Sequence, residues 1–392
     1  MDFCKKCLYP TSHPFGLQLN DGICSGCITH QEKNVINWQE RREALFRILD
    51  EYIGKKRAYD CVVPVVGDAE DYYVLSLVLN LGLAPLVVCV NDYFKNDIGW
   101  HNLHNLITYF DVDSVIFNPD LNVYKELIRT SLRKHDSILL PFHNLHTSFP
   151  VHIACDRNIP LVIWGQNQSV EQVGKFSYLD SVEMSRWSRK QHDLFNVEID
   201  TLIGNGAQVD TRRLNYYQYP DIKKISQQNV RGIYLSNFFR WDPLYQNSKM
   251  CQYGFWPEAN SATFDPYERA GSSVYYNIHD LLKIKRTGYR KFDDHLAREI
   301  RHGRVNTVTL KYLKREYTSS PVNIKPFFKW LGVTESGYRW YVKHRLASFT
   351  NLIENEDSDR PAKISEHFPL IHESSEFIKT PSKHFILYAK GI

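Results

Sequence analysis

The feature that most constrains the fold of this chain is a repeated alternation of short apolar runs with longer amphipathic stretches. The apolar runs cover residues 59–66, 85–90, 114–117 and 161–164. The stretches that separate them predict helices at 72–81, 101–110, 123–133 and 148–158. Strands that are apolar throughout are buried on both faces, and alternation with helices is typical of parallel order. We therefore predict an α/β fold with a parallel sheet covered on both faces.

The first 35 residues lack this alternation and are rich in Cys, Gly and Pro. Two C-x2-C pairs, sixteen residues apart, provide another means of holding such a segment together. This spacing lets two knuckles supply four thiolates to one zinc ion. Because a closed four-cysteine site has no open coordination position, the zinc is expected to be structural. Its predicted ligands are Cys4, Cys7, Cys24 and Cys27.

A length of 392 residues favours two or three folded units. We expect a zinc module at 1–35, an α/β nucleotide domain at 36–230 and a helical region at 231–350. Residues 351–392 have the composition of a linker and a tail, to which the sequence assigns no role.

Charge and hydropathy argue against several classes of partner. The chain carries 48 basic and 44 acidic residues, a net charge of +4, so a large phosphate footprint on nucleic acid is not expected. The longest apolar runs are strand-sized, far below the ~20 residues that span a bilayer. The N-terminus lacks the apolar region of a secretory signal, which predicts a cytoplasmic protein with reduced thiols.

The turn after the first apolar run occupies the place where parallel sheets bind phosphate. Ligands of such sheets lie beyond the carboxyl ends of the strands, where backbone N–H groups of a turn can face an anion. Residues 67–71 fill this place. The positions expected to bind a nucleotide are Pro64, Val66, Gly67 and Asn91.

A series of ordered motifs resembles the N-acetyl sugar amidotransferases of surface-polysaccharide biosynthesis, over about residues 1–350. Besides the paired cysteines and residues 59–65, the resemblance is carried by Asn102 and Asn105, residues 163–167, residues 232–237, residues 240–243, residues 253–255, residues 278–280, Gly288-Tyr289, Asp294-His295 and residues 299–304.

The resemblance implies an adenine nucleotide α-hydrolase-like domain of the PP-loop, or ATP pyrophosphatase, type. In that family ATP and magnesium activate a sugar acetamido group, and ammonia converts it to an acetamidino group in lipopolysaccharide or related glycan synthesis. A separate glutaminase subunit usually supplies the ammonia. The implied partners are therefore an acetamido sugar or sugar nucleotide and a glutaminase.

The phosphate loop departs from the family pattern. Where the family has Ser-Gly-Gly-x-Asp-Ser, this chain has Val66-Gly67-Asp68-Ala69-Glu70-Asp71. Like charges ~4 Å apart repel by about 4 kcal/mol at an effective dielectric of about 20. Three interpretations remain open: a working ATP site in which magnesium compensates the carboxylates, a site for another donor, and a lost nucleotide site. If the loop is active, its catalytic candidates are Asp68, Glu70 and Asp71.

Other polar residues in the family-like segments are candidates for the sugar. Residues 164–167 follow a buried strand, where amides could read a sugar edge; a simple strand-ending turn is the alternative. His302 is a further catalytic candidate, because several cationic groups near it could converge on a sugar diphosphate, although a solvated helix face also explains them. The substrate candidates are His143, Trp164, Gly165, Gln166, Asn167, His295, Arg301 and Arg304. For each histidine the alternative is a satisfied structural role.

A related family, the transfer-RNA-modifying enzymes, also uses such nucleotide domains and zinc modules. The small net charge argues against that assignment.

Overall fold

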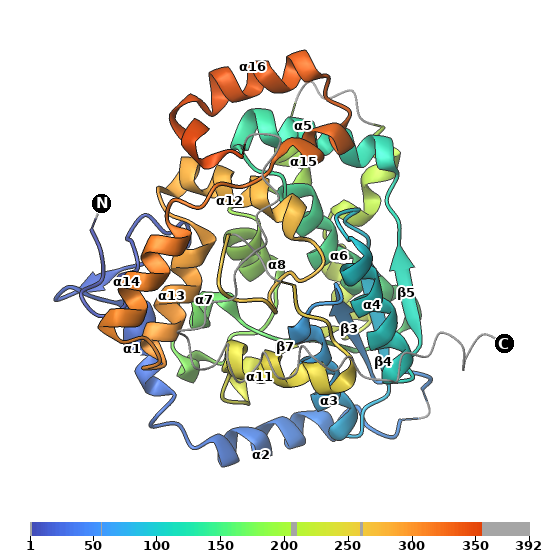
Figure 1. Cartoon of the computed structure of the whole chain (residues 1–392). Helices are drawn as coiled ribbons and strands as arrows, with labels where there is room; N and C mark the ends of the chain where they lie inside the picture. The colour runs from blue at the N-terminus through green and yellow to red at the C-terminus, as the bar shows by residue number, and fades with distance from the viewer. Residues whose placement is uncertain (1, 56, 205–209, 259–261, 355–392) are drawn as a thin grey trace.

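The computed structural model describes residues 2–55, 57–204, 210–258 and 262–354. All of the predicted tail except residues 351–354 therefore lies outside the described residues. Figure 1 shows a sheet on one side of the molecule and a group of C-terminal helices on the other, with the zinc module at the edge.

The central sheet has five parallel strands in the order β5-β4-β3-β6-β7, which confirms the predicted parallel α/β class. The strands are β3 (Cys61–Val65), β4 (Pro85–Val90), β5 (Ser114–Phe117), β6 (Leu161–Trp164) and β7 (Arg231–Tyr234). The chain builds outward from β3 in one direction and then returns to its other side at β6. This reversal is a topological switch point, where sheets of this kind open a crevice for ligands.

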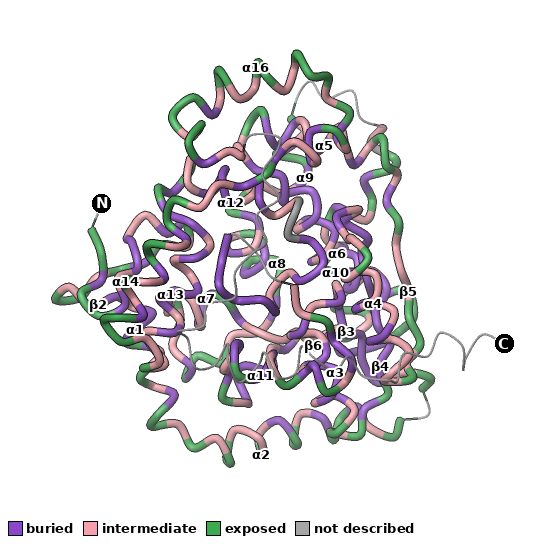
Figure 2. Tube along the Cα trace, in the orientation of Figure 1, coloured by how far each residue is buried: buried purple, intermediate pink, exposed green. Residues whose placement is uncertain are grey.

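Alternate residues of the strands enter two different cores. Cys61, Val63 and Val65 pack in one apolar cluster, whereas Val62 packs in the other. In β4 the residues of the first cluster are Val87 and Cys89. Strands β3 and β4 are buried along their whole length, as Figure 2 shows. Since both faces are buried, a run without polar residues is what the sheet requires.

Helices cover both faces. The cluster around Val63 includes residues of α3 (Ala69–Asn80), α4 (Asp97–Tyr109) and α13 (Lys291–Arg301). The cluster around Val62 includes residues of α5 (Leu121–His135) and α6 (Leu140–Arg157). Other helices of the chain are α1 (Ser25–Glu32), α2 (Trp38–Leu49), α7 (Gln168–Glu171), α12 (Ser273–Thr287), α14 (Thr307–Tyr317), α15 (Lys325–Leu331) and α16 (Glu335–Arg345).

Two elements differ from the sequence-based expectation. Helix α6 begins at Leu140, eight residues before the predicted start, and runs through Pro150. It is buried on nearly all sides, so its sequence has no polar face to reveal a helical period. Strand β7 belongs to the sheet although it lies in the part expected to be helical.

The predicted zinc module consists of the hairpin β1 (Leu19–Asn20) and β2 (Ile23–Cys24) followed by α1. Its cysteines share a small core with Val173, Tyr289 and Ala297, so the module packs against the body of the molecule. Within the described ranges, no helix is long and apolar enough to cross a membrane.

Candidate functional site

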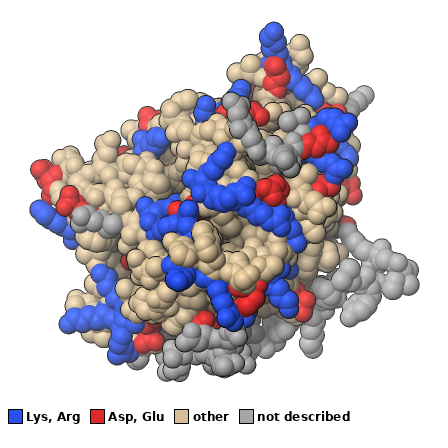
Figure 3. Space-filling view, turned by 90° about the horizontal axis from the view of Figure 1, so that it is seen from above, with Lys and Arg blue, Asp and Glu red and all other residues tan. Residues whose placement is uncertain are grey.

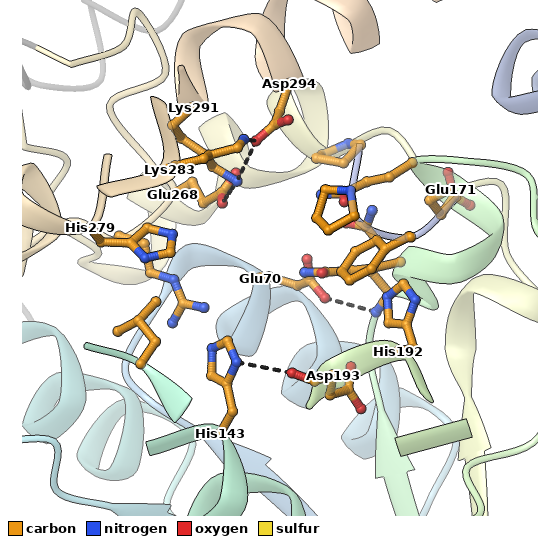
Figure 4. Close-up of a pocket in the computed structure, with 18 of the residues that line it drawn as sticks. Glu70, His143, Glu171, His192, Asp193, Glu268, His279, Lys283, Lys291 and Asp294 are labelled. Carbon is orange, nitrogen blue, oxygen red and sulfur yellow. Dashed lines mark hydrogen bonds and ion pairs between the residues drawn. The ribbon is translucent and has the colours of Figure 1, made fainter. Parts of the chain in front are cut away.

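A cavity of about 770 Å³ opens beyond the carboxyl ends of β3, β6 and β7, at the switch point of the sheet. Its floor includes Val66 and Trp164, and its far wall comes from α12 and α13. In Figure 4, Glu70 lies between Glu268, Lys283 and Lys291 on one side and His143 and Asp193 on the other. The cavity therefore joins the predicted phosphate loop to the C-terminal helices.

The backbone amides of the phosphate loop are already occupied by a side chain. Asp71 Oδ2 accepts hydrogen bonds from the N–H groups of Val66, Gly67 and Asp68 at 2.7, 2.9 and 2.9 Å. Asp68 caps the N-terminus of α3, and with Asp71 it forms a capping box. In a phosphate loop these same N–H groups would face the ligand. Here they hold an internal carboxylate.

The loop closes tightly on α4 because of Gly67. Its φ is +90°, and a Cβ at this position would lie 3.0 Å from the backbone of Leu103. A side chain there would be strained by both its backbone conformation and this contact. The single family glycine retained in the loop is thus required by its geometry.

The other two loop carboxylates are also bound by backbone amides. Asp68 accepts from the N–H of Arg269 at 3.0 Å, and Glu70 accepts from the N–H of Gln166 at 2.8 Å. Burial raises the pKa of Asp68 to about 7 and that of Glu70 to about 8, and it also raises the pKa of Asp71. Asp68 and Glu70 therefore hold their protons far better than exposed carboxyl groups do.

The carboxylates of the loop do not converge into a three-residue metal site. In the parts of the chain that the structure describes, groups of three convergent metal-binding side chains occur at the four N-terminal cysteines and at Asp265, Glu268 and His295. Asp68, Glu70 and Asp71 do not form such a group, and their oxygens are engaged by backbone N–H groups.

The segment 164–167 follows β6 and borders the loop. A Cβ on Gly165 would lie 2.3 Å from Glu70 Oε1, so glycine is needed for Glu70 to reach the amide of Gln166. Asn167 is held at both its side chain and its backbone. Its Oδ1 accepts from the N–H of Ser169 at 3.1 Å, and its own N–H donates to Oγ of Ser236 at 2.9 Å. All four residues of the segment line the cavity.

Neutral imidazoles surround the middle of the cavity. Burial lowers the pKa of His143 to about 4 and that of His146 and His192 to about 3. His143 Nδ1 lies 3.3 Å from the backbone oxygen of Asp193. By contrast, both ring nitrogens of His192 and Nδ1 of His146 and of His279 are buried without a hydrogen-bond partner within the described residues. Unpaired buried polar atoms in a cavity wall indicate that a ligand or water completes them.

The charged far wall could not be identified from the sequence. Lys283 pairs with Asp294, and Lys291 pairs with Glu268 at 2.6 Å. Arg269 lies in the same wall with a φ of +62°, a backbone region that non-glycine residues rarely occupy. A positive φ cannot be predicted from a single arginine in the sequence. The paired residues come from α12, α13 and the segment before α12, and only the tertiary fold brings them to the cavity.

The remaining predicted residues divide between the cavity and its surroundings. His295 and Glu268 lie 2.6 Å apart in the cavity wall. His302 also lines the cavity, where burial lowers its pKa to about 2. Arg304 instead binds Asp242 and Glu299 outside the cavity lining, and Asn91 binds Asn118 and the N–H of Tyr93 in the turn after β4.

The four N-terminal cysteines fit a tetrahedral zinc site. Cys4 and Cys27 have their sulfur atoms 3.9 Å apart, and those of Cys7 and Cys24 are 3.6 Å apart. With Zn–S bonds of ~2.3 Å, the edge of an ideal tetrahedron is about 3.8 Å. Arg301 adds a donor to this site, since its guanidinium lies 3.5 Å from the sulfur of Cys24 and binds the backbone oxygen of Gln172 at 2.6 Å. Arg301 therefore joins the zinc module to the segment after α7.

Comparison with known proteins adds little to this description. No family model and no curated protein matches the sequence. Among solved structures, the chain is similar to an NMN synthetase from Francisella tularensis, at 13% identity and a TM-score of 0.27, over 54% of this chain and 96% of that one. A likeness this low supports no argument about function. The fold class rests on the parallel strands and their order.

Proposed function

We propose that this chain is a homologue of the N-acetyl sugar amidotransferases that binds an acetamido sugar or a sugar nucleotide, and that its phosphate loop no longer holds ATP. The observation that carries this proposal is the Asp71 carboxylate on the three loop amides. Hydrogen bonds to a charged group contribute about 1.5–3 kcal/mol each. A pyrophosphate would have to displace all three and then face the displaced carboxylate.

The rest of the cavity is suited to a sugar. A sugar offers hydroxyl and amide groups that both donate and accept hydrogen bonds. Neutral imidazoles have one donor and one acceptor each, and those of His146, His192 and His279 have nitrogens to spare. The aromatic rings of Phe142 and Trp164 line the same space. Lys283 and Arg269 supply positive charge for a phosphate group of a sugar nucleotide.

The proposal is tested by calorimetric titration of the zinc-loaded protein with UDP-N-acetylglucosamine and with a panel of free acetamido sugars. His192→Phe removes two nitrogens that have no partner among the described residues, so it should leave the fold intact. We expect it to weaken binding roughly three- to tenfold, the effect of one lost hydrogen bond. His104→Phe on α4, outside the cavity lining, is the matched control. Absence of binding by every compound would refute the proposal.

A second candidate is the ATP-dependent amidotransferase itself, with ammonia from a glutaminase partner. What favours it is the position of the cavity at the switch point, in contact with both the loop and residues 164–167. In that case Asp71 must leave the amides when ATP binds. Release of AMP and formation of an amidine, in the presence of ATP, magnesium and ammonium, would establish this candidate.

A further inference from the structure

A chain of hydrogen bonds links a hydroxyl, an imidazole and a carboxylate in the cavity wall. Thr263 Oγ1 lies 2.5 Å from Nδ1 of His295, and Nε2 of the same ring lies 2.6 Å from Glu268 Oε2. His295 is on α13, whereas Thr263 and Glu268 are in the segment before α12. All three residues line the cavity, and Figure 4 shows Glu268 on its wall.

The charge of Glu268 fixes the direction of one of these hydrogen bonds. Burial alone would raise the pKa of Glu268, but the positive charge around it, above all that of Lys291, outweighs burial and holds this pKa well below its usual range. The ionised carboxylate can only accept, so Nε2 of His295 carries a hydrogen, and in the neutral form of the ring Nδ1 has a free lone pair. The hydroxyl of Thr263 then donates to Nδ1. This is the arrangement of a nucleophile, a general base and an orienting carboxylate.

A metal ion explains this cluster less well. Asp265, Glu268 and His295 come close enough together to bind one. However, Arg298 lies 2.7 Å from Asp265 and Lys291 lies 2.6 Å from Glu268, so each carboxylate already has a cationic partner. A divalent ion would have to displace these cationic partners from the two carboxylates.

Solvent reaches the hydroxyl and the imidazole with difficulty. Thr263 is 5% exposed and His295 is 2% exposed. Since both residues line the cavity, a molecule bound there has the access that bulk water lacks. A base and a nucleophile shielded in this way react with what the cavity holds.

We propose that Thr263 is an acyl-accepting nucleophile, with His295 as its general base and Glu268 as the residue that positions His295, and that the substrate is a small ester. The oxygen of Thr263 attacks the ester carbon while its proton moves to Nδ1 of His295. The bond to the alcohol breaks, the alcohol takes that proton, and an acyl group remains on Thr263. Water then attacks the acyl carbon, again through His295, and releases a carboxylic acid and free Thr263.

This activity goes beyond the proposed function, which requires binding alone, and its test uses neither a sugar nor ATP. The full zinc-loaded chain is mixed with 4-nitrophenyl acetate, and release of 4-nitrophenolate is followed. Samples quenched in acid at early times are digested and examined by tandem mass spectrometry. We expect one acetyl group on Thr263. An acetyl group found only on lysine, cysteine or histidine, or no release above that of the buffer, overturns the proposal.

Variants separate catalysis from structure. Thr263→Val should lower the release rate roughly 100-fold or more, as expected when a nucleophile and its base are uncoupled, whereas Thr263→Ser should retain the adduct. Glu268→Gln should lower kcat and leave KM nearly unchanged, because Glu268 acts through His295. Thr130→Val, at a buried threonine of α5, is the control for loss of a hydroxyl. Unchanged release by folded Thr263→Val, judged by thermal denaturation and zinc content, also overturns the proposal.

Discussion

At the scale of single residues, the carboxyl groups of the loop after β3 make the stability of the fold depend on pH. Burial raises the pKa of Glu70 to about 8 and that of Asp68 to about 7. The folded state therefore binds these protons more tightly than the unfolded chain. Their contribution to stability is complete below the ordinary carboxyl pKa and is lost as the pH rises through about 7 to 8.

Glu70→Gln should remove part of this dependence. The amide oxygen can still accept from the N–H of Gln166, but it has no charge to desolvate. One pKa unit corresponds to about 1.4 kcal/mol, and because Glu70 borders the open cavity we expect a gain of only ~1–2 kcal/mol at pH 9. At pH 4, below the ordinary pKa of a glutamate carboxyl, the variant and the native chain should be nearly equal. Urea unfolding at both pH values measures this, and parallel pH profiles would contradict it.

The spacing of the loop carboxylates in the sequence also contained structural information. Asp68 and Asp71 have the three-residue spacing of a capping box at the start of a helix. Considered only as negative charges, Asp68 and Asp71 are predicted to repel the phosphates of ATP. In the structure, Asp71 also binds the loop amides that would otherwise bind the phosphate of a nucleotide. Which amides a side chain will reach depends on the turn of Gly67, which no spacing reveals.

At the scale of elements, the turn of Gly67 is the most demanding junction of the sheet. Gly67→Ala should destabilise the protein by ~2–4 kcal/mol, from positive φ and from contact with the backbone of Leu103. Gly82 has a φ of +80°, and a Cβ added there would meet no atom within 4 Å, so Gly82→Ala isolates the cost of φ, ~1 kcal/mol. Equal unfolding free energies for the two variants would show that the contact with Leu103 does not contribute to the destabilisation.

Arg301 on α13 supports the zinc module from outside. Because it lies against the Cys24 sulfur and binds the carbonyl of Gln172, Arg301→Met should accelerate zinc release roughly 10- to 100-fold, the usual effect of losing an outer partner of a metal ligand. Release is followed with a chromogenic chelator. Arg315→Met, at an exposed arginine of α14, is the control. If both variants release zinc at the native rate, Arg301 does not stabilise the site.

For the elements that were predicted, the bounds of the strands were more accurate than those of the helices, and the reason is physical. Runs such as 85–90 and 161–164 are apolar because both faces are buried, and their bounds match β4 and β6. Helix α6 is just as buried, so it shows no polar face, and Pro150 within it makes a helix still harder to predict. The far wall of the cavity was missed because Lys283, Lys291 and Glu268 meet the strand ends only through the tertiary fold.

At the scale of the whole molecule, the net charge conceals an uneven distribution. Residues 307–345 contain eight basic and two acidic residues, whereas the whole chain has a net charge of +4. Figure 3 shows lysine and arginine side chains gathered across the face seen from above. A small net charge is thus weak support for the absence of a polyanionic partner, and the expectation that the chain does not bind nucleic acid stays a prediction.

The zinc module also completes the wall of the cavity. Its residues Tyr9, His13, Phe15 and His30 line the same space as the strand ends. Removal of zinc should therefore weaken the binding of a cavity ligand as well as lower the melting temperature by several degrees. Calorimetric titration before and after treatment with a chelator, with zinc restored as the control, tests this link. Ligand affinity that survives complete loss of zinc would show that the wall forms without the metal.

The decisive question is whether the Asp71 carboxylate keeps ATP from the backbone N–H groups of the loop. Native protein and the variant Asp71→Ser, which restores the family residue, are titrated with ATP and magnesium in the same calorimeter. We predict no measurable binding of ATP by the native chain. The variant should bind ATP with an affinity at least roughly tenfold above the detection limit for the native chain, a difference of about 1.4 kcal/mol or more, because three N–H groups become free. Equal, tight binding of ATP by both proteins would contradict the account.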